Sequence, residues 1–183
     1  MAVNFELLKE YDRLDCLRRY NHKRTISTES VASHSYYVAL YTQMICNALE
    51  LEDSVKAKAL THAIYHDIGE IYLSDIPYDT KEKFPFMKKM LSGIEEDIIK
   101  EHFPQYSKLW KEVEDRKTTE SLLIYNIIKL SDILSVIQYT SREFSLGNTV
   151  LEHVRTEAVN GRYKLYKTAI EDLTGKKLDI FEE

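Results

Sequence analysis

Residues that break or turn the backbone are scarce in this sequence, which holds only 5 Gly and 3 Pro among 183 residues. A β-sandwich or barrel of this length needs many tight turns and normally uses more of both residue types to make them. A mostly helical protein needs few such turns. Hydrophobic residues make up 44% of the chain, enough for a chain of this size to bury a real core. The composition therefore predicts an all-α fold, in a single domain that spans residues 1–183.

The charge pattern argues against a nucleic acid polymer as a partner, and the hydropathy pattern argues against a membrane. The net charge is −5, and both signs are interspersed along the chain, whereas a nucleic-acid binder carries a basic face. No window approaches the roughly 18 apolar residues of a membrane span, and the stretch MAVNFELLKEYDRL lacks the apolar centre of a signal peptide. We therefore expect a cytoplasmic protein in which Cys16 and Cys46 are reduced core thiols. A local pocket can still hold a small anion such as phosphate.

Apolar residues recur at helical spacing over most of the chain. The expected helices cover about residues 4–19 (with Asn4 as N-cap), 31–50, 53–66, 86–102, 105–115, 119–144 and 149–173. Residues 18–28 are polar and basic, which predicts a loop. Residues 67–89 contain an Asp75-Ile76-Pro77 turn, and Pro85 is expected to break any helix there. We therefore predict a long irregular segment with one short helix near Glu70, a kind of segment that is usually functional.

Ionisable residues lie on the apolar faces of three of these helices, at His34, at His66 and Asp67, and at Asp132. Burying such groups costs several kcal/mol unless they are paired or bind a metal. Two imidazoles and two carboxylates suit a divalent cation, which can polarise a P–O bond and lower the pKa of bound water. Each histidine taken alone is more often a packed core residue, so spacing by itself leaves that alternative open.

Four motifs, taken in order, resemble the HD-domain metal-dependent phosphohydrolases, and more closely the YfbR-like 5′-deoxynucleotidases. The motifs are Thr28-Glu29-Ser30-Val31-Ala32-Ser33-His34-Ser35, Tyr65-His66-Asp67-Ile68-Gly69-Glu70, Ser74-Asp75-Ile76-Pro77 and Lys129-Leu130-Ser131-Asp132. The resemblance covers about residues 14–148 and leaves the last helix without a motif. It implies a helical bundle with a metal site between core helices.

The resemblance implies a role for each matching residue. The metal ligands are His34, His66, Asp67 and Asp132, around one divalent ion that is Co, Mn, Fe, Zn or Ni. Glu70 activates or positions the attacking water, with Asp75 as a second acidic residue in the turn that lines the sugar pocket and excludes a 2′-hydroxyl. The phosphate is oriented by Arg19, whose guanidinium fork suits an anion. The expected substrate contacts are Arg19, Tyr20, Asp75, Ile76, Pro77, Tyr78 and Lys81.

Two positions depart from the family pattern. Tyr20 stands where the family has tryptophan after the arginine, and Ser33 stands where close relatives often have glutamate before the first ligand. These changes bear on base or sugar selectivity and on metal preference, and neither changes a ligand. His62 and His66 have the spacing of a zinc pair, but the family places no ligand at His62, and we expect it to pack. His22 is either within reach of the phosphate or simply exposed.

These features predict a hydrolase that converts deoxynucleoside 5′-monophosphates to deoxynucleoside and phosphate. The alternative within the superfamily is a deoxynucleoside triphosphate hydrolase, and the choice depends on which of Lys23, Arg24 and Lys81 reach the pocket with Arg19. A non-catalytic nucleotide-binding module is a third hypothesis, less favoured because every ligand position and Glu70 are filled. The family resemblance also implies a homodimer.

Overall fold

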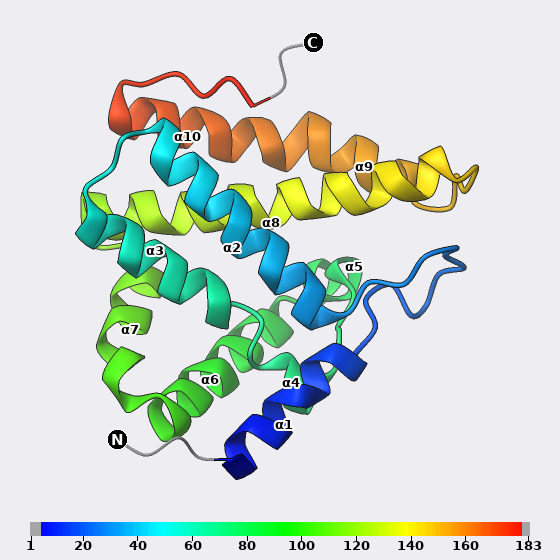
Figure 1. The fold of residues 1–183 in the computed structure, drawn as a ribbon, viewed down its shortest axis with the longest axis horizontal. Coiled ribbons are helices and arrows are strands. Elements are labelled where there is room, and N and C mark those ends of the chain that lie inside the picture. The colour runs from blue at the N-terminus through cyan, green and yellow to red at the C-terminus, as the bar shows by residue number, and fades with distance from the viewer. Residues whose placement is uncertain (1–4, 181–183) are drawn as a thin grey trace.

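The computed structural model describes residues 5–180, and over these residues the chain is helical with no β-strand (Figure 1). The elements in order are α1 (Phe5–Cys16), α2 (Val31–Ala48), α3 (Asp53–Tyr65), α4 (Glu70–Leu73), α5 (Tyr78–Lys83), α6 (Pro85–His102), a 3₁₀ turn η1 (Pro104–Tyr106), α7 (Ser107–Asp115), α8 (Thr119–Ser145), α9 (Glu152–Glu157), a π-helical turn η2 (Ala158–Tyr163) and α10 (Lys164–Thr174). The all-α prediction is confirmed. No described helix has both the length and the apolar character needed to cross a membrane.

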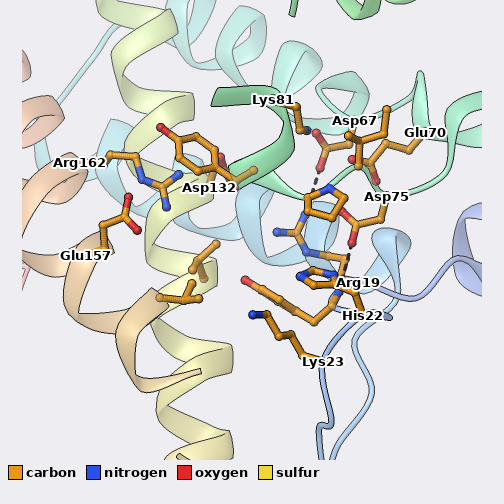
Figure 2. Close-up of a pocket in the computed structure, with 16 residues that line it drawn as sticks. Arg19, His22, Lys23, Asp67, Glu70, Asp75, Lys81, Asp132, Glu157 and Arg162 are labelled. Atoms are coloured by element: carbon orange, nitrogen blue, oxygen red, sulfur yellow. Dashed lines mark hydrogen bonds and ion pairs between the residues drawn. The ribbon is translucent and has the colours of Figure 1, made fainter. Parts of the chain in front are cut away.

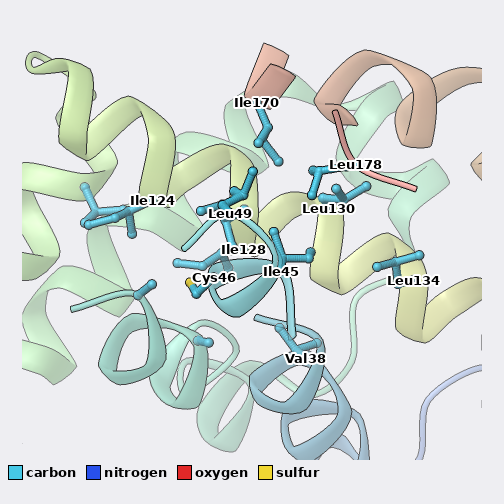
Figure 3. Close-up of a cluster of buried hydrophobic side chains, with 14 residues drawn as sticks. Val38, Ile45, Cys46, Leu49, Ile124, Ile128, Leu130, Leu134, Ile170 and Leu178 are labelled. Atoms are coloured by element: carbon cyan, nitrogen blue, oxygen red, sulfur yellow. The ribbon is translucent and has the colours of Figure 1, made fainter. Parts of the chain in front are cut away.

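The long helix α8 runs through the middle of the molecule (Figure 1). It begins at a reciprocal cap, in which the Thr118 hydroxyl accepts from the Ser121 amide and the Ser121 hydroxyl accepts from the Thr118 amide. Helices α2, α3 and α10 pack on it around one apolar cluster (Figure 3), whose members include Val38, Ile45, Cys46, Leu49, Ile124, Ile128, Leu130, Leu134, Ile170 and Leu178. This packing fixes the distance between α2 and α8, and so between the polar residues that these two helices carry toward one another.

The segment between α3 and α6 is more ordered than the sequence predicts. It holds two short helices, α4 and α5, rather than one. The expected helix break at Pro85 is present, because α5 ends at Lys83 and α6 begins at Pro85. The first backbone N–H groups of a helix have no acceptor within it, so proline loses no hydrogen bond at this position. Its fixed φ also suits a helix start.

The two cysteines and the two ends of the chain differ in part from expectation. Cys46 is buried as predicted, but Cys16 is exposed, since α1 lies on the surface and buries none of its residues fully. The last helix begins at Glu152 and runs to Thr174, with the π-helical turn in its middle. Asn4, the expected cap of the first helix, lies outside the described residues.

Candidate active site

His34 is fully buried in the first turns of α2, which begins at a Ser30 cap that accepts from the Ser33 amide. Its Nε2 lies 3.2 Å from Oδ1 of Asp132 and 3.5 Å from Oδ2 of Asp67. Its Nδ1 lies 3.0 Å from the Ser135 hydroxyl. Burial, with the nearby Arg19 charge, lowers the pKa of this imidazole to about 4, so it is neutral at physiological pH.

His66 directly follows α3 and points toward the same space. Its Nδ1 lies 2.7 Å from the carbonyl oxygen of Ala63, which can only accept a hydrogen bond. Nδ1 is therefore the protonated nitrogen, and in the neutral ring Nε2 carries the lone pair. That Nε2 lies 3.1 Å from Oδ2 of Asp67, and the rings of His34 and His66 are 5.4 Å apart.

These four side chains fit a metal ion. One ligand atom from each of His34, His66 and Asp132 lies within 4.8 Å of the others, and Oδ2 of Asp67 lies within 3.5 Å of both imidazole Nε2 atoms. Both Nε2 atoms are buried and make no hydrogen bond of acceptable geometry. Buried polar atoms without partners are costly, and two nitrogens with two carboxylates form a donor set that first-row divalent metals accept.

Both carboxylates of this cluster are held in the charged form that a metal ligand requires. Burial acts to raise their pKa, but nearby positive or hydrogen-bonding groups outweigh it. His66, His34 and Arg19 hold the pKa of Asp67 well below its usual range, and His34 and Lys129 lower the pKa of Asp132. The half-buried Lys129, one helical turn before Asp132 on α8, was not singled out as a site residue by the sequence analysis.

Glu70 opens α4 three residues after Asp67 and is only 7% exposed. Its Oε2 is buried without a hydrogen-bond partner among the described residues. Burial, and then the negative charge of Asp67, raise the pKa of this carboxyl to about 9. A buried carboxyl with an unused oxygen beside a candidate metal cluster is placed to handle a proton or to hold a water molecule.

Arg19 reaches the cluster from the loop before α2. Its Nη1 lies 3.5 Å from Oδ2 of Asp67, and its Nε lies 3.2 Å from Oε2 of Glu29. The backbones of the two residues are also joined, because the Arg19 amide donates to the Glu29 carbonyl at 2.9 Å. Glu29 was not predicted as a functional residue. Its position in the Thr-Glu-Ser motif just before α2 was the available signal.

One pocket gathers the expected substrate contacts (Figure 2). Its lining residues are Arg19, Tyr20, His22, Lys23, Asp67, Glu70, Asp75, Ile76, Pro77, Tyr78, Lys81, Asp132, Val136, Val154, Glu157 and Arg162. His34 and His66 are not among the lining residues, and neither is Arg24. The last four lining residues come from α8, α9 and η2. None of them was predicted, since Val136 is one apolar residue among many on α8 and the C-terminal helix carries no motif.

A side-chain contact ties two parts of the pocket together. Oδ2 of Asp75 accepts a hydrogen bond from the Tyr20 backbone amide at 3.1 Å. Tyr20 has a left-handed backbone with φ of 56°, a conformation that non-glycine residues seldom adopt. Its ring stacks on Tyr139 with centroids 5.2 Å apart. The aromatic residue beside Arg19 is thus fixed at both its backbone and its ring.

His62 is outside the candidate metal cluster. Its ring stacks on Trp110 with centroids 4.3 Å apart, and its Nε2 lies 3.2 Å from Oε1 of Glu114. Burial lowers its pKa despite that carboxylate. These contacts describe a packed histidine with a partner, as distinct from a ligand.

Comparison with known proteins agrees with this geometry. The family model described as 5′-deoxynucleotidase YfbR-like matches residues 6–174. The relative named 5′-deoxynucleotidase HDDC2, from Dictyostelium discoideum, is 29% identical over 175 residues, which are 89% of this chain and 91% of that protein. A dATP triphosphohydrolase of Cyanophage S-2L is 27% identical over 118 residues, covering 60% of this chain and 66% of the other.

A solved structure supports the fold. It is a Cyanophage S-2L HD phosphohydrolase bound to dA and one catalytic Zn²⁺ ion, which superposes with a TM-score of 0.58 at 18% identity. The match covers 94% of this chain and 98% of that one. At this identity the likeness concerns the helical fold alone.

Proposed function

This chain belongs to the YfbR-like 5′-deoxynucleotidase family, and from that membership we propose that it hydrolyses deoxynucleoside 5′-monophosphates to a deoxynucleoside and orthophosphate. One observation carries the proposal. The cluster of His34, His66, Asp67 and Asp132 opens into a pocket that also holds Arg19 and Glu70. Such a pocket brings a candidate metal site, an anion-binding guanidinium and a proton-handling carboxyl together.

The four clustered side chains are the proposed ligands of one divalent ion, which is Zn, Co, Mn, Fe or Ni. When bound, such an ion polarises a P–O bond and lowers the pKa of bound water. The imidazole of His34 is neutral, and the carboxylates of Asp67 and Asp132 are charged, as ligation requires. The carbonyl of Ala63 fixes the ring orientation of His66.

Arg19 is the proposed phosphate-orienting residue. A guanidinium offers several N–H donors in a rigid plane, which matches two phosphoryl oxygens at once. Glu29 contacts Nε, and Nη1 lies near Asp67, in the wall of the pocket. In phosphoryl transfer most of the catalytic effect comes from positioning and from stabilising charge on the equatorial oxygens. Arg19 supplies both to a phosphate placed beside Asp67.

Glu70 is the proposed proton-handling residue. Its unused Oε2 lies in the wall of the pocket, where it can accept a hydrogen bond from the attacking water and direct it toward phosphorus. Part of the rise in its pKa comes from the negative charge of Asp67. A divalent cation bound by Asp67 would offset that repulsion. It would lower the pKa of Glu70 toward the range that suits a general base at neutral pH.

Asp75 and Tyr20 are the proposed sugar-facing residues. Because one Asp75 oxygen is held by the Tyr20 amide, the carboxylate has a fixed position in the pocket. The resemblance assigns the exclusion of a 2′-hydroxyl to this turn, and the contact between the two residues supports that assignment.

Triphosphate hydrolysis is the second candidate function, and a specific observation favours it. Besides Arg19, the pocket is lined by Lys23, Lys81 and Arg162, which is more positive charge than one phosphate requires. A dATP triphosphohydrolase is also among the relatives. Monophosphate hydrolysis remains the main proposal, because the family match covers residues 6–174 and the phage relative aligns over 60% of this chain.

The decisive experiment measures the products released from dAMP, TMP, AMP and dATP by metal-stripped protein resupplied with Mn²⁺, Co²⁺ or Zn²⁺. We expect orthophosphate from the deoxymonophosphates and little from AMP. Glu70→Gln should lower kcat by about 10²-fold or more with KM little changed, since positioned acid–base groups contribute about that much. Tripolyphosphate from dATP alone would favour the second candidate. Absence of turnover by metal-loaded protein would exclude both.

Two further properties remain proposals. The family match over residues 6–174 supports one HD domain over the chain, and the resemblance alone supports a homodimer. Light scattering coupled to size-exclusion chromatography will give the mass in solution. A mass of twice 21.5 kDa supports the dimer, and a mass of 21.5 kDa rejects it.

A further inference from the structure

Arg162 contributes an unused set of hydrogen-bond donors to the pocket. Figure 2 shows it with Glu157 on the side opposite Glu70 and Asp75. Its guanidinium carbon lies 4.1 Å from the centroid of the Tyr78 ring. That contact uses the face of the ring and none of the N–H groups. Its Nε is buried and has no hydrogen-bond partner among the residues that the structure describes.

The backbone places Arg162 there through an irregularity. Residues Ala158–Tyr163 form a π-helical turn between α9 and α10. A π turn inserts an extra residue into the helical repeat, so the side chains that follow it are rotated relative to those before it, and such turns recur at functional sites. Here Ile170, beyond the turn, is buried in the core, while Arg162 within the turn lines the pocket.

The surroundings of Arg162 suit the base of a nucleotide. A nucleobase has apolar faces and an edge of hydrogen-bond acceptors and donors. The pocket wall includes the apolar side chains of Val136 and Val154, and Glu157, which Figure 2 shows beside Arg162, adds a carboxylate acceptor. The proposed phosphate-binding residues, Arg19, Asp67 and Glu70, lie at the other end (Figure 2).

We propose that Arg162, held by Tyr78 and presented by the π-helical turn, binds the base edge of the deoxynucleotide and determines base preference. The inference rests on the proposed function, because it assumes that the phosphate occupies the metal end. Guanidinium donors pair best with two adjacent acceptors, and guanine offers O6 and N7. Adenine has no carbonyl oxygen. Arg162 therefore favours guanine over adenine.

The first test is a binding measurement that does not depend on turnover. Titration calorimetry, in a metal-loaded Glu70→Gln background, compares dGMP, dAMP and orthophosphate. Arg162→Met should weaken dGMP binding about tenfold or more, the usual worth of a bidentate base contact. The effect on dAMP should be smaller, and the affinity for orthophosphate should stay within about twofold. Arg162→Lys should restore part of the dGMP affinity.

The matched control is Arg155→Met. Arg155 lies on α9, has a buried Nε without a hydrogen-bond partner, and contacts the Phe144 ring at 5.9 Å, but it is not part of the pocket wall. This variant removes the same charge from the same helical segment. It should leave all three affinities unchanged, which separates a local contact from a general loss of positive charge.

Other outcomes overturn the inference. An equal loss for dGMP and orthophosphate means that Arg162 binds phosphate, and unchanged affinities mean that it contacts nothing of the ligand. Equal losses for dGMP and dAMP reject the guanine preference. Failure of the proposed function is recognised separately, as absence of orthophosphate release by the wild-type protein, and leaves the binding comparison valid. In active protein, the same variant should raise KM for dGMP more than it lowers kcat.

Discussion

The guanidinium Nε of Arg19 lies 3.2 Å from Oε2 of Glu29, with side-chain exposures of only 12% and 3%. This buried pair adjoins the candidate metal cluster, because Nη1 of the same guanidinium lies 3.5 Å from Oδ2 of Asp67. Burial acts against the charged form of Glu29 and raises its pKa to about 7, even though the Arg19 charge opposes that rise. Glu29 is thus a positioning residue for the arginine that is proposed to bind phosphate.

Replacing Glu29 should weaken substrate binding more than it lowers the stability of the fold. We expect Glu29→Gln to lower kcat/KM for deoxymonophosphates by about tenfold, mainly through KM, because the change removes the buried ion pair that orients the Arg19 guanidinium. Steady-state kinetics and thermal unfolding of the same samples measure both effects. Glu50→Gln is the control, since Glu50 pairs with Lys176 at the exposed surface. Unchanged kinetics in Glu29→Gln would show that Arg19 is oriented without it.

Metal binding should stabilise the folded chain through the four clustered side chains. At about 100 times the dissociation constant, a metal ion adds about 2.7 kcal/mol to the unfolding free energy, which corresponds to about 5–10 °C in Tm for a chain of this size. His34→Gln should abolish both the shift and the bound metal, as measured by thermal unfolding and elemental analysis.

The matched control for that experiment is His62→Gln. His62 is also buried, but its contacts are Trp110 and Glu114. This variant should lower the Tm of the metal-free protein and still bind one equivalent of metal. Loss of metal from His62→Gln with retention in His34→Gln would reverse the assignment of ligands.

The loop that carries Arg19 should be sensitive to acid through Glu143. This fully buried carboxylate accepts hydrogen bonds from the amides of Ile26 and Ser27, the Ser27 hydroxyl and the Asn148 side chain. Burial acts to raise its pKa, but these hydrogen bonds lower it to about 2. The depressed pKa contributes stability that is fully present above about pH 4.5 and is lost as the pH falls toward 2.

Glu143→Gln should therefore cost about 2 kcal/mol of unfolding free energy at pH 7, as hydrogen bonds to a charged group typically contribute. The difference from the wild-type protein should shrink between about pH 4.5 and 2.5, because both side chains become neutral over that range. Urea unfolding at a series of pH values measures this. A difference that is the same at every pH would mean that the carboxylate charge does not hold the loop.

Ser74 carries backbone strain immediately before the Asp75 turn. Its φ of 63° and ψ of 171° lie in a region that is essentially restricted to glycine and costs about 1–3 kcal/mol for other residues. Ser74→Gly should raise Tm by about 2–4 °C, equivalent to a gain of about 1 kcal/mol. Ser92→Gly, in the exposed middle of α6, should instead lower stability by about 0.5 kcal/mol. Calorimetric unfolding of both variants checks the two opposite signs.

The helical class and the proposed metal ligands were predictable from local patterns in the chain. Few turn-forming residues and helical apolar spacing are local properties, so the main helices appear within a few residues of their predicted limits. His34, His66, Asp67 and Asp132 were recognisable because each stands in a motif and on an apolar face where an ionisable group needs a partner. The helix break at Pro85 was predictable in the same way, because proline cannot continue a helix and suits the first position of the next one.

Side-chain contacts between separate segments of the chain become known only once the helices are packed. Glu29 lies beside Arg19, Arg162 lies over Tyr78, and Glu143 supports the loop at Ser27. Glu29 had only its place in the Thr-Glu-Ser motif as a signal. The pairings of Arg162 and Glu143 leave no pattern in the sequence, because a charged residue on a helix is normally solvated and its spacing says nothing about a partner far along the chain. Apolar burial along α8 fixes where the helices cross, and the crossings then decide which polar side chains are shut off from water and must find one another.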